Sequence, residues 1–431
     1  MIAGTPDIPR AVIIIAAIIF AIATFINTNI GLIAILLSML LSPELEAGAA
    51  ADRAIVVRAE DLLLIIVSIT WLARMAVRKA PLIRQSPLNV PIGLYIAVMA
   101  FSTIRGMAAG DITPVKGTFY VLKLVEYFVL FFIVLNQTTT EKQVKMFLTV
   151  LFLTSIVVGI YGNTHIGAVE RISAPFEGEG EPNTLGGYIL FILSILGGLI
   201  YCYGKRRHIL ILVFLFLIPT FLFTLSRASY LGMFASLVAF TAISKSRKVI
   251  AGISILALAF VLAVAFGPQV LKDRVLGTFQ PEEAQALKRV GPVALGPSPA
   301  ARVESWHRVL TTKVPRKPFF GGGVTGIGFL DSQYILALGE TGFIGLFLFL
   351  WIMWRIWRTA YHTYYTVEKP EFKGLTLGYI AGFAGLLFHA IGSNTFVIIR
   401  IAEPFWFFTA IVIKLVDIET GKAAIKERRM R

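Results

Sequence analysis

The chain has few charged residues for its length and almost no cysteine. Of its 431 residues, 15% are charged and only Cys202 is a cysteine. A lone cysteine in an apolar run excludes a disulfide framework and gives no basis for thiolate chemistry. Acidic residues are also scarce, 25 against 40 Lys and Arg, while 57% of the residues are hydrophobic. This composition excludes an ordinary soluble domain and is typical of a polytopic membrane protein.

Long apolar runs separated by short loops fill most of the chain. They fall near 11–26, 30–42, 59–77, 90–105, 118–136, 146–162, 185–203, 209–225, 228–244, 249–267, 342–359, 375–392 and 402–416. About 20 apolar residues in a helix cross the hydrocarbon core of a bilayer. We therefore predict an all-α polytopic membrane protein with about twelve transmembrane helices, in which residues 11–42 form either one tilted helix or a broken pair.

One apolar stretch, residues 209–244, carries a single charge, Arg227, near its middle. As one helix it would be about 54 Å long, well beyond the ~30 Å hydrocarbon core. Basic clusters at 205–207 and 245–248 flank it, and short cationic loops stay in the cytoplasm. The pattern predicts two membrane helices whose connection, at Ser226 and Arg227, lies on the outer side. An arginine at that depth is a functional candidate.

This orientation divides the chain into three regions. We expect an N-terminal transmembrane bundle (1–267), an extracytoplasmic, partly helical cap over the outer face (268–341), and C-terminal transmembrane helices with a basic cytoplasmic tail (342–431). The basic clusters fall in short loops and in the tail, so they indicate membrane topology and not nucleic-acid binding. The predicted location is the cytoplasmic membrane, and no cleavable signal peptide is evident.

Polar residues suited to catalysis concentrate on the predicted outer side. Arg227 and Arg302 are two of them, and Arg171 with the acidic and glycine-rich run 177–183 is a third group. The run 331–334 is a fourth. Two converging arginines grip a diphosphate by charge-assisted bidentate hydrogen bonds. A nearby carboxylate accepts a proton from an attacking hydroxyl.

Five ordered motifs connect the chain to a known family. They are Arg171 followed by Pro182-Asn183-Thr184-Leu185-Gly186-Gly187-Tyr188; Thr224-Leu225-Ser226-Arg227-Ala228-Ser229-Tyr230-Leu231-Gly232; Arg302 four residues before Trp306; Pro318-Phe319-Phe320-Gly321-Gly322-Gly323; and the run from Asp331 to Gly345. Together, over about residues 60–415, the chain resembles the O-antigen ligase and O-antigen polymerase superfamily of bacterial envelope glycan assembly.

The resemblance implies an activity and a set of partners. The family's enzymes move a glycan from an isoprenoid diphosphate carrier to an acceptor hydroxyl at the outer face of the membrane, without a metal, a nucleotide sugar or another cofactor. The implied partners are the lipid-linked oligosaccharide donor, a glycan acceptor, membrane lipids and envelope-assembly proteins.

The resemblance also implies roles for residues. Arg227 and Arg302 would bind the carrier diphosphate, and Asp331 would face the acceptor as its base. We expect substrate contacts from a further set of outer-side residues, namely Arg171, Asn183, Ser226, Trp306, Gln333 and Tyr334.

The chain departs from the ligase pattern at one position. O-antigen ligases carry a His-Asn pair where this chain has Asp331-Ser332. Aspartate there resembles the polymerase and exopolysaccharide branches, so we favour polymerisation of lipid-linked repeat units. Ligation to lipid A core is the first alternative. A transporter of an anionic lipid-linked solute is a second, although its expected internal repeat is not visible. A structural scaffold is a third, which leaves both arginines without a role.

Three of the candidate residues also have a structural interpretation. Arg227 can extend to phosphate headgroups, as arginines at helix ends do. Arg302 can pair with Glu304 on the cap surface. Asp331 can cap a helix that begins around Ser332, because Asp is favoured at such positions.

Other polar groups have competing interpretations as well. His307 is an alternative base, whereas structural hydrogen bonding is the favoured interpretation of His389. Glu177, Glu179 and Glu181 can chelate a divalent cation, but their alternation with glycine first indicates a solvated loop. The glycine-rich run 321–328 lacks a surrounding strand-loop-helix unit, so it predicts a turn and not a nucleotide-binding loop.

Overall fold

The structure, a computed structural model, describes residues 10–46, 56–79, 83–177, 180–204, 207–247, 250, 252–253, 262, 265–266, 268–276, 288–290, 293–295, 297–328 and 330–421. The helices of this part are α1 (Arg10–Ile26), α2 (Thr28–Leu41), α3 (Ala59–Val77), α4 (Asn89–Ala108), α5 (Pro114–Gln137), α6 (Glu141–Thr164), α7 (Pro182–Cys202), α8 (Arg207–Phe223), α9 (Arg227–Ser244), α11 (Gln269–Leu276), α12 (Pro297–Arg308), the π-helical turn η1 (Val309–Lys313), α13 (Gln333–Thr366), α14 (Pro370–His389) and α15 (Ile399–Glu419).

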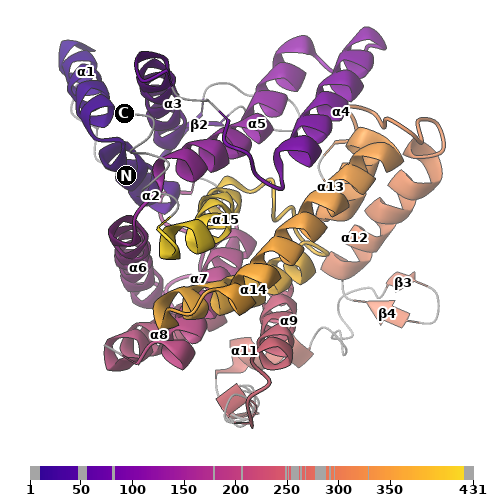
Figure 1. Cartoon of the computed structure of the whole chain (residues 1–431). Helices are drawn as coiled ribbons and strands as arrows, with labels where there is room; N and C mark the ends of the chain where they lie inside the picture. The colour runs from indigo at the N-terminus through magenta and orange to yellow at the C-terminus, as the bar shows by residue number, and fades with distance from the viewer. Residues whose placement is uncertain are drawn as a thin grey trace.

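The protein is a helical membrane protein (Figure 1). In the part of the chain that the structure describes, six helices are long and apolar enough to cross a membrane: α4, α5, α6, α7, α9 and α13. Shorter apolar helices cover 14–26, 28–41 and 207–223. Two short antiparallel strand pairs lie outside the helices, β1 (Glu44–Glu46) with β2 (Val56–Arg58) and β3 (Lys288–Val290) with β4 (Val293–Leu295).

The helices follow the apolar runs closely. The first run is a broken pair, because α1 ends at Ile26 and the Asn27 side chain accepts a hydrogen bond from the Asn29 N–H (3.1 Å) to cap α2. The run predicted at 249–267 lies mostly outside the described residues, as do the middle of the cap (277–287) and the basic tail (422–431).

Helices α7, α9 and α14 form the most closely packed part of the molecule. Glycines bring the backbones together, as is common between membrane helices. A Cβ added to Gly378 of α14 would lie 2.5 Å from the Cα of Ile195 in α7, and one added to Gly232 of α9 would lie 2.7 Å from the carbonyl oxygen of Gly385 in α14. Both positions exclude a side chain. The backbones of the three helices are therefore in close contact at these glycines.

Helix α13 is broken at Gly342, which has φ 69° and ψ −170°. A glycine-rich turn packs against the break and binds the backbone groups that the helix leaves free. The Phe343 N–H donates to the Pro318 carbonyl (2.8 Å), and the Gly323 N–H donates to the Glu340 carbonyl (2.7 Å). Irregular backbone at membrane depth is tolerated where protein groups satisfy it in this way. This is the turn that the sequence predicts.

Replacing Gly342 with alanine is expected to destabilise the protein by about 1–3 kcal/mol or more. Its backbone conformation is open only to glycine, and an added Cβ would lie 2.3 Å from the carbonyl carbon of Phe319. Thermal unfolding in lipid or detergent measures the effect. Gly93→Ala in α4 is the matched control, because nothing lies within 4 Å of its added Cβ. Equal unfolding temperatures for the two variants would contradict the packed kink.

The cap is tied to the connection between α4 and α5. The Lys317 ammonium pairs with the Asp111 carboxylate, and the Arg105 guanidinium lies 5.6 Å from the centre of the Phe320 ring. The hydrogen bond from Lys317 lowers the pKa of the Asp111 carboxyl below its usual value. This pairing is therefore present at neutral pH and weakens as the pH falls through that lowered pKa.

Candidate functional site

The helices α8 and α9 are separated at residues 224–226, where the sequence predicts the connection of two membrane helices. α8 packs on α6 and α7, and α9 packs on α14 and α7. Leu225 adopts a positive φ of 49°. Arg171 binds this connection, since its Nε donates to the Thr224 carbonyl (3.3 Å) and its guanidinium also donates to the Leu225 carbonyl (3.4 Å). A cation is favourable at such carbonyls after a helix C-terminus.

Ser226 and Asn183 join the beginnings of two helices. The Ser226 Oγ–H donates to Asn183 Oδ1 (2.7 Å), and Ser226 Oγ accepts hydrogen bonds from the Ser229 N–H (3.2 Å) and the Ser229 Oγ–H (2.8 Å). Ser226 is thereby the N-cap of α9, and its side chain is fully buried. The next residue, Arg227, is half-buried at the first position of α9. The network fixes where the Arg227 side chain starts.

Arg302 and Asp331 form an ion pair. Nε of Arg302, on α12, donates to Oδ2 of Asp331 (3.2 Å), and the two side chains are 24% and 30% exposed, so solvent reaches both. A pairing of Arg302 with Glu304 stays a prediction. Capping by Asp331 is wrong, because the N-cap of α13 is Ser332, whose side chain makes no capping hydrogen bond. The carboxylate of Asp331 instead connects the cap to the start of α13.

Gln333 and Tyr334 bind protein groups at the start of α13. The Gln333 N–H donates to the Ala390 carbonyl (3.0 Å), and Gln333 Oε1 accepts from the Phe396 N–H (2.9 Å). The Tyr334 hydroxyl donates to the Leu387 carbonyl (2.7 Å). These bonds hold the start of α13 against the end of α14. A contact of either side chain with sugar stays a prediction.

Contacts link these motifs at one end of the helices. The Gln333 N–H also donates to the Ser393 carbonyl (3.2 Å), in the turn that follows α14. A Cβ added to Gly392 of the same turn would lie 3.5 Å from Cβ of Ala228, the neighbour of Arg227. The segment that carries Asp331 and the beginning of α9 thus both contact one short turn. The structure brings both segments to the same end of the bundle.

The surroundings of His389 could not be predicted from the sequence. It is fully buried, and its Nδ1 shares a hydrogen bond with Thr395 Oγ1 (2.8 Å), which confirms a structural bond. Its Nε2 is buried and lies near the Asn183 backbone. A Cβ added to Gly187 would lie 3.3 Å from this Nε2, so the ring faces the start of α7. In the sequence, the only indication of this residue is its position near the end of a long apolar run.

Trp306 packs in a small apolar cluster between the cap and α13, with Val309, Leu330 and Leu336. Its Nε1 is buried without a hydrogen-bond partner in the described part of the chain. A buried indole N–H usually finds an acceptor. Trp306 therefore remains a candidate to donate a hydrogen bond to a substrate oxygen. The neighbouring His307 side chain is exposed.

The acidic run 177–181 is not entirely exposed to solvent, because Glu177 is buried. Glu177 lies against Arg400, Oε1 to Nε 3.6 Å, with both side chains buried, while Glu179 lies outside the described residues. Arg400 also donates to the carbonyls of Pro175 (2.7 Å) and Leu40 (3.3 Å). Sequence reasoning missed this contact between α2, the 165–181 connection and α15. Among the described residues, no three His, Cys, Asp or Glu are placed to hold a metal.

We expect Arg400→Gln to lower the stability of the protein by about 3–5 kcal/mol, because it leaves the buried Glu177 carboxylate without its charge partner. Thermal unfolding of the purified protein measures this. Glu177→Gln and the double variant complete the cycle, in which the double variant should recover part of the loss. Strictly additive losses would show that the two groups do not interact.

The chain was compared with known protein families. Residues 210–350 match the family model described as O-antigen ligase. This segment is an O-antigen ligase family domain. The predicted superfamily is thereby confirmed over these residues. The domain contains Arg227, Arg302 and Asp331, whereas Arg171 and Asn183 precede it. It runs from α8 through the cap into α13, so Arg227 precedes the cap sequence and Arg302 lies within it. No curated protein matches the chain.

Proposed function

We propose that this protein polymerises lipid-linked glycan repeat units at the outer face of the cytoplasmic membrane. The family domain supports the transfer of a lipid-linked glycan in general. The finer assignment rests on aspartate, in place of the ligases' histidine, at position 331. In this proposal the bundle (1–267) and the C-terminal helices (342–431) hold the carrier lipid, and the cap (268–341) covers the sugars.

The proposed reaction is a displacement at the anomeric carbon of the donor. The acceptor hydroxyl oxygen forms a bond to this carbon while the bond to the diphosphate oxygen breaks. The hydroxyl proton passes to the Asp331 carboxylate. The diphosphate leaves on its isoprenoid carrier with increased negative charge, which Arg227 and Arg302 stabilise. Preorganised donors aimed at a developing charge are usually the largest single contribution to catalysis.

The observation that carries this proposal is the Arg302–Asp331 ion pair inside the family domain. In the proposed reaction the guanidinium of this pair would bind the leaving group, and the neighbouring carboxylate would serve the incoming hydroxyl. Arg227 stands at the first position of α9, where the helix dipole and free N–H groups also favour an anion. In this proposal, the groups that act on the leaving diphosphate and on the incoming hydroxyl are therefore neighbours.

Ligation of a finished glycan to a separate acceptor is the second candidate function. The description of the matching family, O-antigen ligase, favours it. Both functions use the same donor and the same arginines, so they differ in the acceptor. A polymerase must accept a second copy of the lipid-linked repeat. A ligase must accept a different lipid.

Reconstitution separates the two candidates. The full chain is purified into lipid, supplied with a defined isoprenoid-diphosphate oligosaccharide, and its products are separated on a gel. A ladder of multiples of the repeat is the expected result. A single transfer to added lipid A core, with no ladder, would identify a ligase. We expect EDTA to leave the reaction unchanged; strong inhibition would return the acidic run 177–181 to consideration as a metal site.

A further inference from the structure

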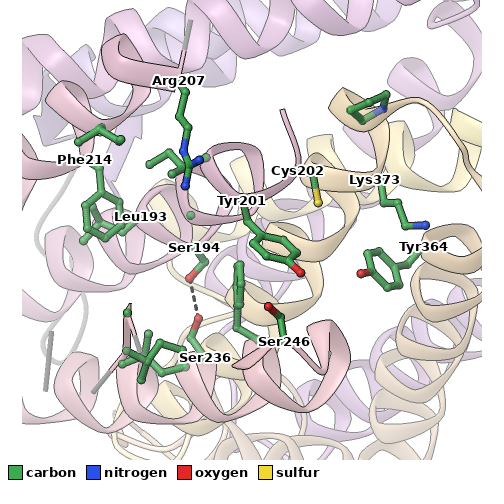
Figure 2. A pocket seen from close by; sticks show the side chains of 18 of the residues that line it. Leu193, Ser194, Tyr201, Cys202, Arg207, Phe214, Ser236, Ser246, Tyr364 and Lys373 are labelled. Atoms are coloured by element: carbon green, nitrogen blue, oxygen red, sulfur yellow. Dashed lines mark hydrogen bonds between the residues drawn. The ribbon is translucent and has the colours of Figure 1, made fainter. Parts of the chain in front are cut away.

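A large cavity lies at the end of the bundle away from the candidate site. Its volume is about 1080 Å³, and it is bounded by α7, α8, α9 and the beginning of α14 (Figure 2). Two of its lining residues, Tyr201 and Cys202, belong to the last turn of α7, whereas Asn183 of the candidate site lies at that helix's first turn. The cavity and the candidate site therefore occupy opposite ends of the same helices. The volume is at the upper limit of pockets that hold small-molecule ligands.

The wall of the cavity is largely apolar. Its apolar lining includes Leu193, Ile211, Phe214, Met233, Leu237 and Phe240, of which Ile211 is exposed. Two hydroxyls in this wall, those of Ser194 on α7 and Ser236 on α9, bond to each other (2.8 Å; Figure 2), and the Ser194 hydroxyl also donates to the Leu190 carbonyl (2.8 Å). The wall thus offers ordered water few partners. A cavity of this kind favours an apolar occupant over water.

The rim of the cavity is basic. Arg207 begins α8, Arg247 follows α9, and Lys373 lies in the first turn of α14 with its ammonium 5.4 Å from the centre of the Tyr364 ring. Glu368 is the one carboxylate among the described residues of the lining. Arg207 and Arg247 are exposed. Three cations against one anion leave a positive rim above an apolar interior.

We propose that this cavity binds an anionic glycerophospholipid of the cytoplasmic leaflet. An acyl chain would occupy the apolar interior, and the headgroup phosphate would meet Arg207, Arg247 and Lys373. The division into an apolar interior and a cationic rim matches an amphipathic anion. The loops that carry the rim are those that the positive-inside pattern assigns to the cytoplasm, where anionic lipids attract basic residues and basic pockets between helices bind lipid headgroups.

A lipid bound here would act on the helices that carry the candidate site. Its chain would fill the space between α7, α8 and α9, and α7, α9 and α14 are the closely packed set whose other ends hold Asn183, Arg227 and His389. Binding would therefore resist separation of these helices. The lipid site does not depend on the proposed transfer reaction, because its test measures binding alone.

Native mass spectrometry of the delipidated full-length protein tests the site with three probes: phosphatidylglycerol, phosphatidylcholine and an isoprenoid monophosphate. We expect phosphatidylglycerol to bind at least about tenfold more tightly than phosphatidylcholine, because each rim cation near an anionic headgroup favours it. Preferred binding of the isoprenoid phosphate would overturn the assignment to a glycerophospholipid. Equal binding of phosphatidylglycerol and phosphatidylcholine would overturn the role of the rim.

Two kinds of variant locate the binding. Replacing Arg207, Arg247 and Lys373 together with serine should weaken phosphatidylglycerol binding at least about tenfold. Lys142→Ser, which removes an exposed cation at the start of α6 outside the lining, is the control and should have no effect. Gly197→Leu fills the interior instead, since an added Cβ meets only one atom within 4 Å, Cε2 of Phe240 at 3.7 Å.

Gly197→Leu keeps the test decisive if the triple variant fails to fold. It should abolish the tight phosphatidylglycerol complex while its unfolding temperature without lipid stays near that of the wild type. Retention of the complex at wild-type affinity in Gly197→Leu would contradict the site. Retention in a folded triple variant would do so equally.

Discussion

Alanine in place of either Arg227 or Arg302 is expected to abolish glycan extension in the reconstituted reaction. Loss of one preorganised donor at a developing negative charge typically reduces turnover about 10²–10³-fold, or ~3 kcal/mol in the barrier. Arg227 stands at the beginning of α9, and Arg302 reaches the same end of the bundle through Asp331. Each should hold one part of the leaving diphosphate. The measurement is the initial rate of product formation in lipid.

Two control variants sharpen this prediction. Arg316→Ala removes an exposed arginine of the same cap and should leave the rate near the wild-type value. Arg302→Lys retains the charge but not the planar pair of donors, so it should fall between wild type and alanine. An unfolding temperature near that of the wild type in each variant would exclude a folding defect as the cause of lost activity. Full activity in either Arg227→Ala or Arg302→Ala would reject the proposed diphosphate clamp.

Asparagine in place of Asp331 is expected to reduce turnover about 100-fold or more while donor binding survives, in line with the usual contribution of a general base. The substitution retains an oxygen that accepts the hydrogen bond from Arg302 Nε, so the cap should remain docked on α13. It removes the ability to accept the acceptor's proton. Turnover and donor binding are measured separately on the same preparation.

The outcome for Asp331→Asn distinguishes a base from a structural residue. If donor binding and turnover fall together, Asp331 holds the cap or contacts the donor. If turnover stays at the wild-type rate, the base lies elsewhere, and His389 is the next candidate because its buried ring faces the start of α7, where Asn183 lies. His389→Gln would then be the decisive variant.

The positions of the membrane helices could be predicted because hydropathy acts locally. An apolar run of about 20 residues must form a helix in lipid, since no water is present to satisfy its backbone. The run at 209–244 shows the strength of this reasoning. Its length alone requires a break, and the break lies at residues 224–226, next to the one charge that the run contains.

Hydropathy alone does not predict the start of α13. The apolar run indicates a membrane span from 342, whereas the helix begins at Gln333, as the capping interpretation of Asp331 expects, and kinks at Gly342. The helical turns before the kink are stable because the Pro318–Gly323 turn forms hydrogen bonds with the backbone groups that the kink frees. That pairing joins segments that hydropathy treats separately. The predicted boundary of the cap at 341 therefore falls on the kink.

Polar contacts between distant segments are the other part that the sequence does not reveal. Arg400 finds Glu177 across more than half of the chain, and Lys123 of α5 pairs with Asp61 of α3 in the interior. Glu403 is fully buried nearby. Composition predicts that buried charges will have partners but not which ones. The pairing of Arg302 with Asp331 is of the same kind, although the sequence correctly singled out both residues.

A structure of the protein in lipid with the isoprenoid diphosphate donor bound tests the central claim most directly. The expected map shows the two linked phosphates between the Arg227 and Arg302 guanidiniums, with Asp331 toward the open side. Phosphates bound elsewhere, or held by only one of these arginines while the other points to lipid, would contradict the account.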